Sequence, residues 1–339
     1  MSFDIGAQGA LEAIDVHAHH LPRQVLEIDQ RFASSRDARG LEWLYFEGRR
    51  LGPLTPKLTD LGLMLEDQSN SRLTRRLCCT ASWLTGYWAD SKLGQRLSRT
   101  INEAIAEATR DHPGQLLGLA TVPLQDSKLA IAELAYAVSE LGLVGAAVGT
   151  NVNGAYFDDP RFDGFLEAAQ ELDVPLFFHP NDVAGWERQR EYALIQLLGN
   201  PHEACLSLVR MILGGTLERF PRLKPCFPMG GGSVGLLLGR LSHGWRVREE
   251  ARVKAPKPPE EYLDRIYFDT VLHSAKSLEL VLEVISPDRL VLGTDYPWEM
   301  GQQGAVELIE HSRLSPDQRR AVLAGNAQRL LDRKLPLKV

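Results

Sequence analysis

Eight short, strongly apolar runs recur along the chain, separated by stretches with helical spacing. The runs cover residues 13–17, 76–81, 116–122, 143–149, 174–179, 223–228, 266–271 and 289–294. They are almost continuously apolar and do not alternate with polar residues, which is typical of parallel strands covered on both faces. Between them, apolar residues at three- and four-residue spacing in 127–142 and 274–285 predict amphipathic helices.

This alternation predicts an α/β fold, a (β/α)8 TIM-type barrel, with a doubly wound open sheet as the alternative. The length of 339 residues suits one large barrel, so we treat 1–339 as a single domain. Residues 21–57 lie between the first and second predicted strands and are too long for a simple connection. We therefore expect them to form an insertion that covers the barrel mouth as a lid.

The composition excludes several classes of protein. Hydrophobic residues make up 44% and charged residues 24%, as in an ordinary soluble globular protein. The net charge of -6 argues against nucleic-acid binding, and no apolar stretch is long enough to cross a membrane. Residues 1–20 show no basic segment followed by an apolar one, so we expect no secretory signal and a cytoplasmic location. Four cysteines are too few for a disulfide framework, and we expect reduced thiols.

Residues that can bind a metal ion fall at the ends of three predicted strands. His17 and His19 end the first strand, and because they flank one residue their side chains project to the same side of an extended chain. His179 ends the fifth strand and Asp295 follows the eighth. Such strand ends meet at one face of a barrel, so three imidazoles and a carboxylate can share Zn²⁺ or a similar ion. The alternative is that these residues cap the strands; Asp15 is expected to support the set.

Longer motifs resemble a known family. The chain contains, in order, "IDVHAHHLP", "FFHP", "MGGGSVGLLLGRLSHGWRVR", "FDT" and "LVLGTDYPW". On these motifs it resembles the amidohydrolase superfamily, and within it the branch typified by 2-amino-3-carboxymuconate-6-semialdehyde decarboxylase. The resemblance implies that His17, His19, His179 and Asp295 bind one divalent metal ion, zinc in the first place and manganese as the alternative.

The same resemblance implies that an arginine from a neighbouring subunit holds a substrate carboxylate. The matching residue is Arg240. A guanidinium grips a carboxylate through two parallel hydrogen bonds, so this residue indicates a small carboxylic acid as substrate. It also predicts a homodimer or a higher homo-oligomer. The alternative for Arg240 is a salt bridge on a helix surface.

Two positions depart from the family pattern. The decarboxylases place a histidine, the expected general base, before three glycines at the end of the sixth strand, where this chain has Met229. A thioether cannot exchange protons. A second substrate-holding arginine has no clear counterpart in 58–68. We assign catalytic roles to Asp295, Arg240 and His273; His273 is a candidate for the missing base, with a structural role as its alternative.

Aromatic residues in segments that leave strand ends are candidates for the wall of a substrate pocket. We expect Trp186 and Trp298 to contact the substrate, although such residues taken singly are more often core or interface. The full set is Trp83, Tyr87, Trp186, Tyr296 and Trp298.

Three functions remain open from the sequence. The first is a metal-dependent non-oxidative decarboxylase of an aromatic or unsaturated carboxylic acid. The second is a metal-dependent hydrolase or hydratase that uses metal-activated water, which Met229 favours. The third is a catalytically reduced homologue that binds a ligand or an active partner chain.

Overall fold

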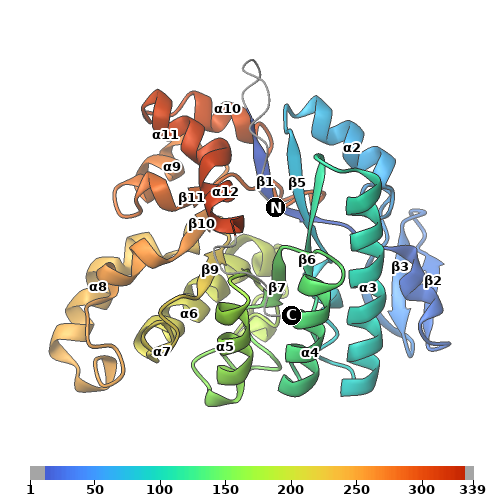
Figure 1. Cartoon of the computed structure of the whole chain (residues 1–339), viewed down its shortest axis with the longest axis horizontal. Helices are drawn as coiled ribbons and strands as arrows, with labels where there is room; N and C mark the ends of the chain where they lie inside the picture. Colours follow the sequence, from blue (N-terminus) through green and yellow to red (C-terminus); the bar gives the residue numbers. More distant parts are fainter. Residues whose placement is uncertain (1–11, 333–339) are drawn as a thin grey trace.

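The computed structural model describes residues 12–332 and shows eight parallel strands in a barrel, with helices outside it (Figure 1). In order around the barrel, the strands are β1 (Ile14–His19), β5 (Arg75–Cys79), β6 (Leu116–Ala120), β7 (Gly145–Gly149), β8 (Pro175–His179), β9 (Lys224–Phe227), β10 (Tyr267–Asp269) and β11 (Leu290–Val291). The ring closes because the Val16 N–H donates to the Leu292 carbonyl over 2.9 Å and Ala18 pairs with Tyr296. The predicted barrel is confirmed and the open sheet is excluded.

Each predicted apolar run overlaps one observed strand. The last strand is short because the Leu292 N–H donates to the Val322 carbonyl and so leaves the strand ladder. The two predicted helices are present as α4 and α9. The helices are α1 (Pro56–Thr59), α2 (Leu61–Asn70), α3 (Ser91–Asp111), α4 (Ser127–Ser139), α5 (Asp163–Glu171), α6 (Asn200–Leu213), α7 (Thr216–Arg219), α8 (Val234–Val247), α9 (Ala275–Leu282), α10 (Ala305–Glu310), α11 (Pro316–Arg320) and α12 (Asn326–Leu331).

Aspartates begin three of the helices that pack around the strands. Asp60, Asp90 and Asp126 stand just before α2, α3 and α4, and each carboxylate accepts two backbone N–H groups of the first turn. This satisfies donors that a helix start leaves unpaired.

The core lies on both sides of the strands, because successive side chains of a strand point to opposite faces. Phe177 contacts the ring of His17 at 4.8 Å between centroids. The next residue, Phe178, stacks on Phe227 at 4.7 Å in the apolar cluster shared with the outer helices. The alternation therefore places a metal-ligand candidate on the inner side of β1.

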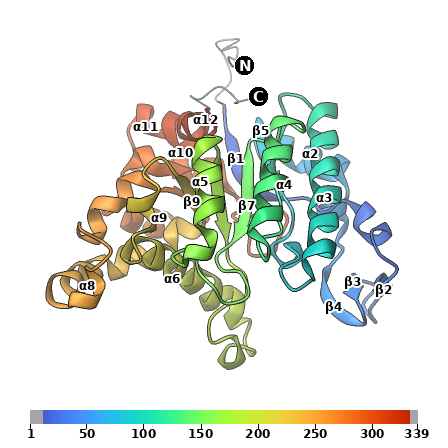
Figure 2. The ribbon, with the colours of Figure 1, turned by 60° about the horizontal axis from the view of Figure 1, so that its bottom comes forward.

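The segment 21–57 contains a small sheet of its own, which the sequence analysis did not predict. The strands β2 (Phe32–Arg36), β3 (Glu42–Phe46) and β4 (Arg49–Pro53) pair antiparallel after a short 3-10 helix, η1 (Arg23–Glu27). Figure 2 shows this sheet at the lower right of the view, below α3. Phe46 packs on Trp88 with the ring centroids 4.8 Å apart, which anchors the sheet to the barrel domain.

No helix within residues 12–332 is long and apolar enough to cross a membrane. The four cysteines are buried free thiols, as expected. The expectation of no secretory signal rests in part on residues 1–11, which lie outside the described residues.

Candidate metal centre

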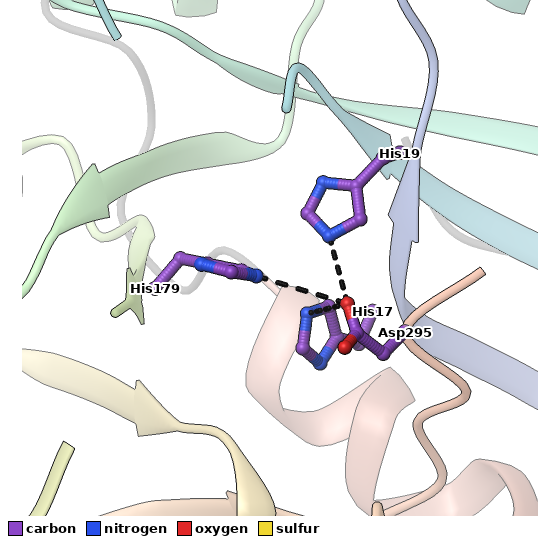
Figure 3. Close-up of side chains that lie close together, drawn as sticks. All are labelled: His17, His19, His179 and Asp295. Atoms are coloured by element: carbon purple, nitrogen blue, oxygen red, sulfur yellow. Dashed lines mark hydrogen bonds and ion pairs between the residues drawn. The ribbon is translucent and has the colours of Figure 1, made fainter. Parts of the chain in front are cut away.

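Three imidazoles and one carboxylate converge at the carboxyl ends of the strands. His17 and His19 come from β1, His179 ends β8, and Asp295 follows β11. Their candidate ligand atoms all lie within 4.8 Å of one another. Figure 3 shows the three rings directed at the carboxylate. The distances from Nε2 to Oδ1 of Asp295 are 3.1 Å for His17, 3.0 Å for His19 and 3.7 Å for His179.

The other nitrogen of each ring faces an acceptor that fixes the ring. An Nδ1–H that donates leaves the Nε2 lone pair of the neutral ring free for a cation. The acceptors are Asp269 Oδ2 for His17 at 2.6 Å, the Thr80 carbonyl for His19 at 2.9 Å and the Pro180 carbonyl for His179 at 3.0 Å.

Two of the convergent nitrogens lack a hydrogen bond of normal geometry. They are Nε2 of His17 and Nε2 of His179, and both atoms are buried. Buried polar atoms almost always have a hydrogen-bond partner, so two unpaired nitrogens that face the same point indicate a ligand between them. Three nitrogens and one carboxylate oxygen are a donor set that suits Zn²⁺ or a similar divalent ion. The residues present therefore fit a metal ion.

The charges of these groups influence one another. Burial alone would lower the pKa of His17, but the nearby carboxylates of Asp295 and Asp269 have the larger effect and raise this pKa to about 10. Burial lowers the pKa of His19 to about 4. Burial also opposes ionisation of Asp295, yet the imidazoles hold the pKa of this carboxyl well below its usual range. The site thus keeps an ionised carboxylate among imidazoles, as a cation requires.

A buried ion pair lies beside the site. Asp15 accepts the backbone N–H of His17 over 3.0 Å and that of Thr294 over 2.9 Å, and its other oxygen accepts from Nε of Arg76 over 3.0 Å. Asp15 therefore links β1 to the segment that carries Asp295, in the supporting position that the sequence suggested.

Asp269 is a site residue that the sequence analysis missed. It ends β10 inside the quoted motif "FDT", is fully buried, and contacts His17 directly. The signal was available, because a carboxylate at a strand end of a barrel faces the same end as the other candidates.

A large cavity opens on the metal centre. Its volume is about 1410 Å³, and His179, Asp295 and Met229 are among the residues that line it. Residues of segment 21–57 form one side, and Trp83 and Trp298 contribute aromatic surface. Among the described lining residues, Arg39 is the one arginine or lysine. The arrangement can hold a planar organic acid beside a cation.

The structure separates the other predicted residues into three groups. Trp298 and His273 line the cavity, and Trp298 lies 5.7 Å from His19 between ring centroids. Arg240 is exposed on α8 and is not among the residues that line the cavity of the same chain. Trp186 is 49% exposed, stacks with Arg190 and is absent from the lining, so the structure does not bring it to the site.

Two further aromatic candidates serve other roles. Tyr87 is buried, and its hydroxyl accepts the Gly149 N–H over 3.2 Å. Tyr296 donates its hydroxyl to Asp67 over 3.1 Å and lines a smaller neighbouring cavity. Both positions depend on the path of loops between distant segments, which the local pattern does not reveal.

The fold and the site together define a metal-binding (β/α)8 barrel with its candidate active site at the carboxyl ends of the strands. The family model described as Amidohydrolase matches residues 14–333. The chain belongs to this family, as its motifs predicted.

Several similar proteins are decarboxylases. The 2-amino-3-carboxymuconate-6-semialdehyde decarboxylase of Dictyostelium discoideum is 29% identical over 94% of this chain and 91% of its own length. The crystal structure of 5-carboxyvanillate decarboxylase from Sphingomonas paucimobilis matches with a TM-score of 0.82 and 25% identity, over 95% of this chain and 99% of that one. The dihydroxybenzoic acid decarboxylase of Polaromonas sp. JS666, solved with manganese and 2-nitroresorcinol, has a TM-score of 0.79 and 22% identity, over 94% and 96%. The predicted resemblance to the decarboxylase branch is confirmed.

Proposed function

We propose that the protein is a metal-dependent, non-oxidative decarboxylase of an aromatic or unsaturated carboxylic acid. The observation that carries this proposal is the convergence of His17, His19, His179 and Asp295 at a cavity with aromatic walls. The similarity to decarboxylases along nearly the whole chain supports it.

One divalent ion is the proposed cofactor. The three Nε2 atoms and the Asp295 carboxylate would hold it, and zinc is our first choice because it favours such nitrogen-rich sets. Manganese is the second, since it is bound in the Polaromonas neighbour. When bound, the ion supplies a Lewis acid that polarises oxygen atoms of the substrate.

The walls of the cavity favour a planar substrate. Trp83 and Trp298 both line the cavity, and Trp298 stands close to His19. Aromatic side chains gain energy from offset or edge contacts with another ring. These residues would therefore orient the unsaturated part of the acid while its carboxylate faces the metal centre. Residues 21–57 line the open side, as a lid would.

Arg240 is proposed to hold the acid in the cavity of a second subunit. It is exposed on α8, and the same helix presents Leu236, which is 79% exposed at the edge of the cavity. A homodimer that packs these helices over neighbouring cavities would cover this apolar surface and supply the guanidinium. Within one chain, Arg39 can meet a second acidic group of the substrate.

The chemistry needs one proton at the carbon that loses carbon dioxide. Met229 lines the cavity at the end of β9 and cannot provide it. His273 also lines the cavity and is exposed to it, so its imidazole is the proposed proton donor. Asp295 also lines the cavity, and besides its role as a ligand it is proposed as a second catalytic residue beside the substrate.

A hydrolase or hydratase is the second candidate function. Met229 favours it, because the site has no titrating side chain where the decarboxylases have their histidine. For either activity a cytoplasmic location is proposed, since all four cysteines are free buried thiols.

The test is a substrate panel with metal-loaded protein. Hydroxybenzoic acids and muconate-type acids are assayed for carbon dioxide release, and esters and lactones are assayed in parallel for hydrolysis. Carbon dioxide release that disappears in His179→Ala supports the proposal. Hydrolysis alone replaces it with the second candidate, and inactivity on both panels with metal bound favours the catalytically reduced homologue.

A further inference from the structure

Asp269 is a fully buried carboxylate whose two oxygens serve two parts of the site. Oδ2 accepts a hydrogen bond from Nδ1 of His17 over 2.6 Å. Oδ1 accepts the backbone N–H of Met229 over 2.6 Å and that of Val271 over 3.0 Å. The two backbone donors require an acceptor, so Oδ1 is fixed toward them and Oδ2 toward His17.

On a third side, Asp269 lies close to the backbone of Gly293. A β-carbon at Gly293 would lie 2.8 Å from Cβ and 3.0 Å from Oδ2 of Asp269. Contacts below about 3 Å are strongly repulsive, so any side chain at position 293 would collide with Asp269. The orientation of Asp269 is therefore fixed by hydrogen bonds from its two oxygens, and glycine at position 293 leaves room for it.

This orientation decides which nitrogen of His17 carries the proton. An ionised carboxylate has only acceptors, so the Nδ1 that faces it has to be the donor. In the neutral ring Nε2 is then unprotonated, and Nε2 is the atom that faces Asp295 and the other ligand candidates. We propose that Asp269 is a positioning residue that makes His17 a metal ligand by fixing its tautomer.

The same carboxylate also holds the corner of the chain at Met229. The backbone of Met229 has φ 57, in the left-handed region that non-glycine residues rarely adopt. Its N–H is tied to Oδ1 of Asp269, so one side chain connects a metal ligand to the residue that stands in the place of the family's base. The inference rests on the metal site proposed above, and it extends that site to the end of β10.

An amide at this position reverses the hydrogen-bond pattern. In Asp269→Asn the two backbone donors keep Oδ1 as their acceptor, so the NH₂ group is turned toward Nδ1 of His17. Nδ1 then has to accept, and the neutral ring carries its proton on Nε2, which cannot bind a metal ion. Asp269→Ala removes the carboxylate without imposing either tautomer.

The experiment measures Zn²⁺ and Mn²⁺ affinity of the intact chain by chelator competition, with ¹⁵N-histidine NMR of the His17 ring. We expect affinity to fall on the order of 100-fold in Asp269→Asn and about tenfold in Asp269→Ala, within the range for changes around metal ligands. The NMR spectrum of Asp269→Asn should show the Nε2–H tautomer. A role in packing alone predicts the opposite order, because asparagine preserves the shape and alanine does not.

Glu203→Gln is the matched control. Glu203 is also a fully buried carboxylate that accepts a side-chain amide, from Asn151 over 3.0 Å, and a backbone N–H, from Ala184 over 2.9 Å, but it contacts none of the ligand candidates. The Glu203→Gln substitution should reduce thermal stability and leave metal affinity unchanged. The inference is overturned if Asp269→Asn binds metal as tightly as Asp269→Ala. Absence of binding by the unaltered chain would instead refute the proposed metal site.

Discussion

The indole of Trp83 lies directly against the backbone of Gly52. A β-carbon at position 52 would lie 2.2 Å from Cε2 of the indole, and both residues line the cavity. No side chain at position 52 can therefore enter the cavity, and the indole of Trp83 occupies this part of its wall.

Gly52→Ala should displace the Trp83 indole. The overlap is with a bulky ring, and we expect a loss of about 1–3 kcal/mol in the free energy of unfolding together with a higher KM for the acid. Tryptophan fluorescence and urea unfolding measure both changes. Gly244→Ala is the control, since nothing lies within 4 Å of a β-carbon there. Unchanged fluorescence and unchanged stability would show that the Trp83 indole can move aside without cost, which would contradict the prediction.

Metal affinity should rise with pH. The pKa of His17 is raised to about 10 while that of His19 is lowered to about 4, so between pH 7 and pH 9 His17 carries an excess proton in the metal-free site and His19 does not. Metal binding must displace this proton, so between pH 7 and pH 9 affinity should increase about tenfold for each pH unit. Titration calorimetry in buffers of different ionisation enthalpy counts the proton released. Affinity independent of pH would mean that Nε2 of His17 is already free.

Breaking the Asp15–Arg76 pair should destabilise the barrel. The side chains are 0% and 2% exposed, and Arg76→Ala leaves the Asp15 carboxylate buried without its cation. The free energy of unfolding, measured in urea, is expected to fall by about 3–5 kcal/mol. Arg248→Ala removes an exposed pair with Glu250 and should cost less than about 1 kcal/mol. Equal losses in the two variants would contradict the importance of burial.

The pattern of strands was predictable because buried parallel strands need apolar side chains on both faces, and few other elements produce such runs. The convergence of the four ligand candidates was predictable for a related reason: the barrel brings all strand ends to one face, so His17 and Asp295 could be combined although 278 positions separate them. The role proposed for Asp269 was not predictable, because a tautomer depends on which atoms face each other.

The small sheet in 21–57 and the position of Trp186 were missed for different reasons. "EWLYF" followed by Glu47 and Gly48 is a hairpin signal that a search for longer strands passes over. Trp186 follows a barrel strand just as Trp298 follows another, but its loop turns the indole outward. Nothing local distinguishes the two residues.

Met229→His should increase decarboxylation if the remaining site still fits this chemistry. The hydrogen bond from the backbone N–H of residue 229 to Asp269 does not depend on the side chain. An imidazole can therefore replace the thioether while the backbone conformation at this position is kept. A general base or acid contributes on the order of 10² or more in rate. The measurement is kcat for the best acid of the panel, with Met229→Leu as the control. Equal rates in both variants, at equal metal content, would show that His273 or another group already supplies the proton.

Arg240 should act across a subunit interface. Arg240→Ala is expected to raise KM for the acid while metal content stays unchanged, because the residue lies outside its own cavity. The decisive measurement mixes this variant with His17→Ala after reversible dissociation. In a mixed dimer the Arg240→Ala chain keeps its metal ligands and receives an intact arginine from its partner, so random pairing restores about one quarter of the original sites. If mass spectrometry demonstrates mixed dimers but activity does not recover, Arg240 does not act across the interface, and its alternative role as a salt bridge on the helix surface is favoured.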